Sequence, residues 1–401
     1  MTLRARRILS FLLCFLPWLL VTTPGLSAPL RERVDAVLRR AVEEERLVGA
    51  VVLVARHGRV VHAGAWGWSD REARRAMRPD AVFRLASLSK PVTSAVVLAL
   101  AERGALSLED PVTRWLPWFA PELPGGGGAV ITVGQLLTHT AGLTYGFLQP
   151  PGGTYARAGV SDGLDRPGIT LEENLRRLAS VPLAGAPGGA WSYSLAVDVL
   201  GAVAEQAGGA PLPELTARLV TGPLNMLDTG FLVSDPERLA VPYVREGGVL
   251  RRMDDPQVVA FGASGARFAP SRITDPGAYP SGGAGMCGTA SDYLAFLEVV
   301  RAGGAALGTK AARSMTQNRL EPGQGGPGPG WGFGYGAAVL LDPAAAGSPS
   351  ARGTWRWSGA YGAFFLVDRA SGLSLVVLTN TTPDGMDGEF PWELVRAVYG
   401  R

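Results

Sequence analysis

A serine that stands three residues before a lysine, at the start of a long apolar segment, constrains this chain more than any other feature. Ser87 and Lys90 lie in the run Phe83-Arg84-Leu85-Ala86-Ser87-Leu88-Ser89-Lys90-Pro91, and apolar residues follow as far as Leu100. Positions i and i+3 of a helix share a face, so both side chains can point into one site. Pro91 fits the first turn of a helix, whose N–H groups have no partner within the helix. We therefore expect a helix that starts at Ser87 and is closed by Gly104.

The scarcity of lysine points to a chemical role for Lys90. The chain has only two lysines, Lys90 and Lys310, among 38 basic residues. An arginine cannot lose its proton, whereas a desolvated lysine can become neutral and act as a base. A helix start also offers free N–H groups to a developing oxyanion. The pattern predicts an activated serine nucleophile. The alternative is that Ser87 only caps the helix and Lys90 is a solvated side chain.

Residues 1–28 have the order of a secretory signal peptide. Three arginines precede an apolar run, and Leu26-Ser27-Ala28 offers a cleavage site. The run is short for a bilayer-spanning helix, so an uncleaved anchor is the weaker alternative. We expect a protein exported to the periplasm or the exterior of a bacterial cell, with residues 29–401 forming the mature domain that carries Ser87 and Lys90.

The mature composition excludes several classes of partner. Removal of the signal leaves 35 basic against 35 acidic residues, so we expect no nucleic acid partner and membrane contact only through the signal. Cys287 is the one cysteine outside the signal, which excludes an internal disulfide. His57, His62 and His139 have no metal-ligand spacing, so we predict no metal and no cofactor. The first two read as structural residues, and His139 as a hydrogen-bonding brace for the site.

Strand-like segments occur at both ends of the chain, with helix-like segments between them. Hairpin-length turns indicate antiparallel pairing. We expect an α+β (mixed α/β) fold in which an antiparallel sheet is flanked by helices and carries an inserted, mainly helical domain. The sheet subdomain takes approximately 29–86 and 286–401, and the helical subdomain approximately 87–285. The predicted strands are 51–55, 60–63, 334–341, 354–357, 363–368 and 373–378. The predicted helices include 31–47, 132–137, 171–178, 195–204, 213–220, 291–300 and 392–399, whereas 245–285 reads as a Gly/Pro-rich loop.

Ser161 is a competing candidate for the nucleophile. It occupies the centre of Gly159-Val160-Ser161-Asp162-Gly163, which matches the G-x-S-x-G pattern. That pattern marks a nucleophile elbow only between a strand and a helix. Gly, Pro and Asp surround Ser161 instead, so we interpret it as a structural residue.

Three motifs in order give the chain a family resemblance. Ser87-Leu88-Ser89-Lys90, Tyr193-Ser194-Leu195 and Trp357-Ser358-Gly359 resemble the motifs of the serine β-lactamase and penicillin-binding-protein superfamily. The chain is most similar to its class C-like esterase branch, the family VIII carboxylesterases. Residues 137–143, 223–231 and 285–296 also resemble that branch. The resemblance covers nearly the whole mature chain and implies a β-lactamase/transpeptidase-like fold.

The resemblance implies a role for each motif. Ser87 would be the nucleophile of an acyl-enzyme, and Lys90 and Tyr193 would share its proton and that of the attacking water. The N–H groups of Ser87 and Ala360 would form the oxyanion hole. The sequence does not say which of Lys90 and Tyr193 holds the proton, because coupled groups titrate together.

Two departures from the family pattern bear on the substrate. Leu195 stands where the second motif usually has asparagine, and Trp357 where the third usually begins with lysine or histidine. Neither can hold a polar amide or a carboxylate, so we expect hydrolysis of small neutral esters. Trp357, Ser358, Gly359 and Tyr361 would line the substrate site, although Trp357 can also be read as a core aromatic. The alternatives are a β-lactamase, a D-Ala-D-Ala peptidase or an acyltransferase, and less plausibly a non-catalytic binding protein.

Overall fold

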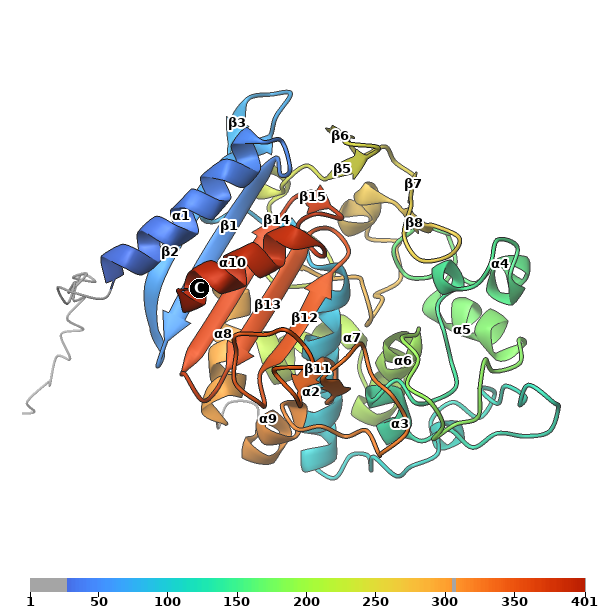
Figure 1. Cartoon of the computed structure of the whole chain (residues 1–401). Helices are drawn as coiled ribbons and strands as arrows, with labels where there is room; N and C mark the ends of the chain where they lie inside the picture. Colours follow the sequence, from blue (N-terminus) through green and yellow to red (C-terminus); the bar gives the residue numbers. More distant parts are fainter. Residues whose placement is uncertain (1–26, 305–307, 401) are drawn as a thin grey trace, which may run out of the picture.

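An eight-stranded antiparallel sheet forms the frame of the computed structural model, which describes residues 27–304 and 308–400 (Figure 1). The strand order is β10-β11-β12-β13-β14-β1-β2-β3. Strand β1 lies beside β14, with Val52 opposite Val377, so the two ends of the chain meet in the middle of the sheet. This confirms the predicted sheet. Its strands are β1 (Gly49–Arg56), β2 (Arg59–Asp70), β3 (Arg75–Ala76), β10 (Trp331–Phe333), β11 (Ala338–Leu340), β12 (Trp355–Gly359), β13 (Ala363–Asp368) and β14 (Leu373–Thr379).

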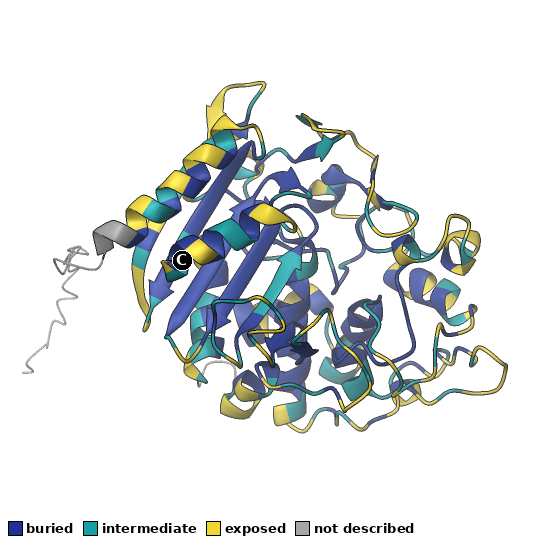
Figure 2. Cartoon of the chain, viewed as in Figure 1, coloured by how far each residue is buried: buried dark blue, intermediate teal, exposed yellow. Residues whose placement is uncertain are grey.

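Helices cover both faces of the sheet. Helices α1 (Ser27–Glu43) and α10 (Glu389–Tyr399) lie side by side on one face (Figure 1). Val52 and Val54 point into the core on that face, whereas Val51 belongs to the larger core on the other, because side chains alternate along a strand. With both faces covered, β1 and β14 are buried almost throughout (Figure 2).

Helix α2 (Ser89–Glu102) runs through the molecule between the sheet and the other helices (Figure 1). Every residue from Ser89 to Leu100 is buried, and Gly104 follows the helix in the left-handed conformation that a C-terminal glycine permits. The other helices are α3 (Val133–Leu137), α4 (Thr154–Ala158), α5 (Leu171–Ala179), α6 (Ala196–Gly208), α7 (Leu212–Thr216), α8 (Ala290–Ala302) and α9 (Thr309–Met315).

Two sequence-based expectations about strands are wrong. The segment expected as a loop contains a hairpin whose two strands are joined by Gly247 and Gly248, both at positive φ. Tight hairpins favour such residues at the turn, so the glycines mark the hairpin and not a loop. Residues 334–341 are not one strand, because the chain turns between β10 and β11. The small strands are β4 (Phe83–Arg84), β5 (Tyr243–Glu246), β6 (Val249–Arg252), β7 (Gln257–Val259), β8 (Ala266–Phe268), β9 (Cys287–Gly288) and β15 (Thr381–Thr382).

The predicted signal peptide lies almost wholly outside the described residues, which begin at Ser27 in helix α1. Within residues 27–304 and 308–400, no helix combines the length and apolarity needed to cross a membrane. The same part of the chain has no cluster of three or more His, Cys, Asp or Glu side chains that could hold a metal ion.

Candidate active site

A strained turn carries Ser87 into a cavity at the start of helix α2. Ser87 lies in a 3₁₀ turn, Ala86–Leu88, that leads directly into the helix. Ala86 has a φ of 44°, a region that residues other than glycine rarely occupy. Such strain persists only where the surroundings fix the backbone, and it is common at functional sites. Ser87 therefore precedes the helix by one turn, close to the predicted position.

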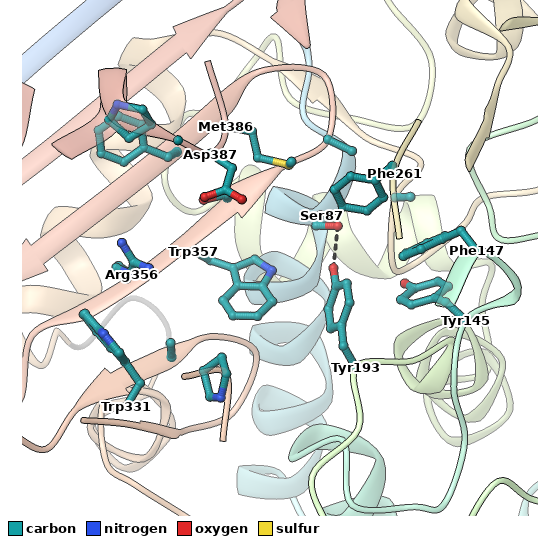
Figure 3. A pocket seen from close by; sticks show the side chains of 18 of the residues that line it. Ser87, Tyr145, Phe147, Tyr193, Phe261, Trp331, Arg356, Trp357, Met386 and Asp387 are labelled. Atoms are coloured by element: carbon teal, nitrogen blue, oxygen red, sulfur yellow. Dashed lines mark hydrogen bonds between the residues drawn. The ribbon is translucent and has the colours of Figure 1, made fainter. Parts of the chain in front are cut away.

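Ser87 Oγ lies between two groups that can exchange protons. Lys90 Nζ donates to Ser87 Oγ at 3.0 Å, and Tyr193 OH donates to the same oxygen at 2.5 Å. Lys90 is fully buried, and its Nζ lies 4.7 Å from the centre of the Tyr193 ring. Figure 3 shows the tyrosine hydroxyl directed at the serine. The arrangement is that of a serine with a base on either side.

Tyr193 is held in place by the segment that includes His139. The N–H of Ser192 donates to the carbonyl oxygen of His139 at 2.9 Å, and His139 Nδ1 shares a hydrogen bond of 2.9 Å with Ser194 Oγ. Burial, with a smaller contribution from the Lys90 charge, holds the pKa of His139 well below its usual range. A neutral imidazole 5.1 Å from the Tyr193 ring acts as a brace, as the sequence predicted.

Asp198 stands behind Lys90, and sequence reasoning missed it. Its Oδ1 accepts hydrogen bonds from the N–H of Gly283 at 2.8 Å and from Ser281 Oγ at 2.7 Å. The carbonyl of Gly283 in turn accepts from Lys90 Nζ at 2.8 Å. Burial raises the pKa of Asp198 above its ordinary value. The available signal was an acidic residue within the otherwise apolar buried run of α6.

The third motif lies at the end of β12, beside the Ser87 turn. A Cβ on Gly359 would come within 2.2 Å of the carbonyl oxygen of Leu85. Gly359 thus allows the strand to pack against the turn, and this packing role differs from the predicted contact with substrate. Ser358 and Ala360 line the cavity together with Ser87. This brings the backbone of Ala360 to the site, as the oxyanion-hole prediction requires.

Tyr361 does not line this cavity, so its predicted role as a wall for substrate is wrong. It is buried, with its ring packed edge-on against Phe268 at 5.0 Å and 5.8 Å from the guanidinium of Arg84. Tyr361 and Arg84 border a smaller space instead. The chain turns sharply here, because Gly362 adopts a φ of 103°. The turn leaves Ala360 at the cavity and directs Tyr361 into the core.

Aromatic side chains are prominent in the walls of the cavity, which encloses about 350 Å³, because nine of its 22 lining residues are Phe, Tyr or Trp. Trp357 lines it as predicted, and its indole packs against Tyr193 at 5.3 Å and against Phe333 at 5.2 Å. The remaining aromatic walls and one arginine come from loops and strand ends far apart in the sequence, which is why sequence reasoning missed them. These additional residues are Tyr145, Phe147, Trp191, Phe261, Trp331, Arg356, Phe364 and Trp392. Figure 3 labels five of them, Tyr145, Phe147, Phe261, Trp331 and Arg356.

Ser161, the competing nucleophile candidate, and the free cysteine Cys287 are not among the residues that line this cavity. Ser161 is buried. Its Oγ donates a hydrogen bond to the carboxylate of Asp165 and forms another of 3.0 Å with Tyr279 OH. No basic side chain contacts it among the described residues. Cys287 is buried in the short strand β9, where burial raises the pKa of its thiol to about 12. Neither residue has the partner that an activated nucleophile needs.

Comparison with known proteins agrees with this geometry. The family model described as Beta-lactamase matches residues 34–400. The chain belongs to the β-lactamase family. Esterase EstB of Burkholderia gladioli is 51% identical over 379 residues, which cover 94% of this chain and 96% of EstB. As a β-lactamase-family member with this esterase relative, the chain is a carboxylesterase-like serine hydrolase.

Solved structures of the β-lactamase family show the same fold. EstCE1, described as a hydrolase with promiscuous acyltransferase activity, superimposes with a TM-score of 0.91 at 43% identity, covering 93% of this chain and 99% of EstCE1. A class C β-lactamase from Rhodobacter sphaeroides superimposes with a TM-score of 0.66 at 19% identity, covering 92% and 99%. The second match supports the fold alone, and it confirms the predicted β-lactamase/transpeptidase-like architecture.

Proposed function

We propose that this chain is an exported carboxylesterase that hydrolyses small neutral esters through an acyl-enzyme on Ser87. The observation that carries the proposal is the position of Ser87 Oγ, with Lys90 Nζ at 3.0 Å and Tyr193 OH at 2.5 Å, in a cavity lined by many aromatic side chains. The 51% identity to EstB, whose name gives it as an esterase, supports the same reaction class.

Acylation begins with Ser87 Oγ attacking the ester carbonyl carbon. The serine proton passes to the Lys90–Tyr193 pair, and the carbonyl oxygen becomes an oxyanion that the N–H groups of Ser87 and Ala360 stabilise. When the tetrahedral intermediate collapses, the carbon–oxygen bond to the alcohol breaks and the pair returns the proton to the leaving alkoxide. The products of this half-reaction are a free alcohol and an acyl ester on Ser87.

Deacylation repeats the same steps with water. The Lys90–Tyr193 pair removes a proton from the water as its oxygen attacks the acyl carbon. Collapse breaks the bond to Ser87 Oγ, which regains the proton, and the carboxylic acid leaves. The fully buried Lys90 suits this exchange because it has no bulk water to compete for its proton.

The aromatic walls support a neutral ester over a β-lactam. Trp357 occupies the motif position where a lysine or histidine would meet a substrate carboxylate next to the reacting carbonyl. Burying that carboxylate without a partner costs several kcal/mol. The alternatives of a β-lactamase or a D-Ala-D-Ala peptidase therefore rank below the esterase.

Acyl transfer is a second candidate because the cavity walls are apolar. The Ser87 acyl ester can react with an alcohol in place of water, and aromatic side chains such as Phe147 and Phe261 favour an organic acceptor. The relative EstCE1 is a hydrolase described as having promiscuous acyltransferase activity, which supports this candidate. The ratio of transfer product to acid, measured at increasing alcohol concentration, tests it.

Two experiments on the same purified protein, active-site labelling and substrate kinetics, test the esterase assignment. A fluorophosphonate probe followed by peptide mapping should label Ser87, and an adduct on Ser161 would overturn the assignment. On the same preparation, kcat/KM for a short-chain nitrophenyl ester should exceed that for a chromogenic cephalosporin. Comparable or faster cephalosporin turnover would favour a β-lactamase.

Export rests on the order of residues 1–28 in the sequence. We expect the mature chain to begin near Pro29, with Cys287 as a free thiol. Mass spectrometry of the periplasmic or secreted fraction measures the N-terminus directly. Retention of residues 1–28 in the membrane fraction would support the uncleaved anchor instead.

A further inference from the structure

The cavity that contains Ser87 continues past Trp357 into a second compartment. Figure 3 shows Trp331 and Arg356 on the far side of the Trp357 indole from Ser87. We call this part the tryptophan compartment and define it by Arg356, the two indoles next to its guanidinium, Trp331 and Trp392, and the nearby Asp387, all of which line the cavity. The acyl-transfer steps on Ser87 make no use of it.

Arg356 is stacked between the two tryptophans of this compartment. Its guanidinium carbon lies 4.5 Å from the ring centre of Trp331 and 4.5 Å from that of Trp392. Each indole packs against the cation, and an indole offers no hydrogen-bond acceptor atom to its N–H donors. The Arg356 side chain makes no hydrogen bond or ion pair with any residue in 27–304 or 308–400.

Arg84, another arginine near the site, differs from Arg356 because its guanidinium donors are used in hydrogen bonds within the protein. It lies beside the smaller space bordered by Tyr361, and it donates to the carbonyl oxygens of Pro270 at 2.8 Å and Ala240 at 2.9 Å. Arg356 has no such acceptors among the residues that the structure describes. Arg356 is half-buried, and none of its nitrogens is among the buried side-chain atoms without a partner, so its donors are open to the cavity and available to an anionic ligand.

The electrostatics of the compartment leave Arg356 charged. Burial lowers the pKa of its guanidinium to about 10, and the nearby negative charge of Asp387 opposes that shift. The group therefore carries its proton at neutral pH. Asp387 lines the same compartment without forming an ion pair with Arg356, so it moderates the positive potential but leaves the donors open.

We propose that the tryptophan compartment binds a carboxylate group at the far end of an ester substrate, with the Arg356 guanidinium as its hydrogen-bond donor. This inference rests on the proposed esterase function. It leaves the preference for small neutral esters unchanged, but for longer esters it predicts a preference for those that carry a carboxylate remote from the scissile bond. The apolar part of such a substrate would cross Trp357, and the charged end would meet the guanidinium edge.

The position of Arg356 on β12 sets the length of the substrate. Arg356 precedes Ala360 by four residues, which corresponds to roughly 13 Å along a strand. Even with the reach of the arginine side chain, the carboxylate must be separated from the reacting carbonyl by several methylene groups. A β-lactam carries its carboxylate only a few bonds from the carbonyl, so Arg356 does not rescue β-lactam binding. The carboxylate can belong to the acyl part or to the alcohol part of the ester.

The kinetic test compares charged and neutral esters of equal length. For the acyl part, monomethyl esters of dicarboxylic acids from succinate to sebacate are compared with their dimethyl esters. For the alcohol part, acetates of ω-hydroxy acids, which keep a free carboxylate, are compared with the same acetates after the carboxylate has been converted to its methyl ester. The measured quantity is the ratio of kcat/KM for the charged ester to that for the neutral one. In the wild type this ratio should pass through a maximum at an intermediate chain length in one of the two series.

Variants of the compartment should change this ratio in opposite directions. Arg356→Gln should lower the maximum by about 10-fold or more, the scale of a lost charged hydrogen bond. Asp387→Asn should raise it, because the competing negative charge is gone. Arg176→Gln is the matched control, since Arg176 also stacks on an indole, Trp118 at 4.4 Å, outside the cavity. An Arg356→Gln ratio equal to the wild type at every length would overturn the inference.

A binding measurement separates this inference from the esterase proposal. The monoamide of a dicarboxylic acid is not turned over as an ester, and its binding beside Trp331 and Trp392 should change tryptophan fluorescence. The monoamide should bind the wild type at least about 10-fold more tightly than the uncharged diamide. Arg356→Lys should retain part of that difference, because it keeps the charge without the planar fork. Equal binding of monoamide and diamide would overturn the inference even if esters are hydrolysed, whereas a missing esterase activity alone would leave this readout intact.

Discussion

Asp198 and Lys90 both bind Gly283, through the two peptide groups that flank its Cα. The N–H of Gly283 donates to Asp198 Oδ1 at 2.8 Å, and the Gly283 carbonyl accepts from Lys90 Nζ at 2.8 Å. A Cβ on Gly283 would lie 3.2 Å from the Asp198 oxygen and 3.6 Å from Lys90 Nζ. The buried carboxylate therefore fixes the backbone that fixes the lysine.

We expect Asp198→Ala to lower kcat by about 10- to 100-fold with little change in KM. The variant frees the Gly283 peptide and misplaces Lys90 Nζ relative to Ser87 Oγ, and small misplacements of reacting groups are costly. Asp198→Asn should restore most of the activity, because its amide oxygen can still accept from the Gly283 N–H. Steady-state kinetics on an ester substrate separates kcat from KM. A folded Asp198→Ala variant with wild-type kcat would show that Asp198 has no positioning role.

Lys90→Arg should be as damaging as Lys90→Ala. Arginine keeps the positive charge but cannot exchange a proton, and the Lys90 site is fully buried with its acceptors already at hydrogen-bond distance. Lys310→Arg is the matched control, because Lys310 is the other lysine of the chain and is exposed. Ester turnover by the purified variants measures both. Substantial activity in Lys90→Arg would mean that Lys90 acts only as a fixed charge.

Substitution of Ser87 should affect mainly catalysis, whereas substitution of Ser161 should affect mainly stability. Ser87→Ala should reduce kcat by at least about 1,000-fold. Ser161→Ala should retain most of the turnover and lose about 1–3 kcal/mol of unfolding free energy, because Ser161 Oγ contacts Asp165 and Tyr279 in the core. Ester kinetics and urea unfolding of both variants measure the two effects. Loss of turnover in a stable Ser161→Ala variant would contradict the assignment.

Sequence reasoning could predict the parts of the site that depend on local structure. Ser87 and Lys90 are three residues apart, so helical geometry alone brings them together. The strands on either side of the 56–59 turn were predictable for the same reason, because alternation and turn residues lie within one short segment. The resemblance of three ordered motifs added Tyr193, which lies 106 residues from Ser87 and which no periodicity could connect to it.

The parts that sequence reasoning missed depend on long-range packing. Arg356 and Trp392 meet only because α10 packs across the sheet near β12. Asp198 has its role because Gly283 returns from a distant loop. Tyr361 was misplaced because the turn at Gly362 decides whether a side chain points to the cavity or to the core, and the sequence does not fix that direction.

A pH-dependent contribution to stability should come from Asp162, which lines the cavity opposite the tryptophan compartment. Its carboxyl oxygens accept from the N–H of Gly146 at 2.7 Å and from the N–H of Phe147 at 3.0 Å. Burial raises the pKa of this carboxyl to about 6 despite those two donors, and the charges of Asp165 and Asp198 act in the same direction. The folded protein therefore binds this proton more tightly than the unfolded chain, where the pKa is about 3.9.

The sign of the effect follows from proton linkage. Because the folded-state pKa is raised, the stabilisation is fully present below about pH 4 and is lost as the pH rises through about 6. Asp162→Asn has no proton to lose at this site, so the unfolding free energy of the wild type should fall relative to that of the variant by up to about 3 kcal/mol across this interval. Urea unfolding of both proteins at closely spaced pH values measures the difference. A difference that stays constant between pH 4 and 7, or that grows in favour of the wild type, would show that the two backbone donors compensate fully for burial.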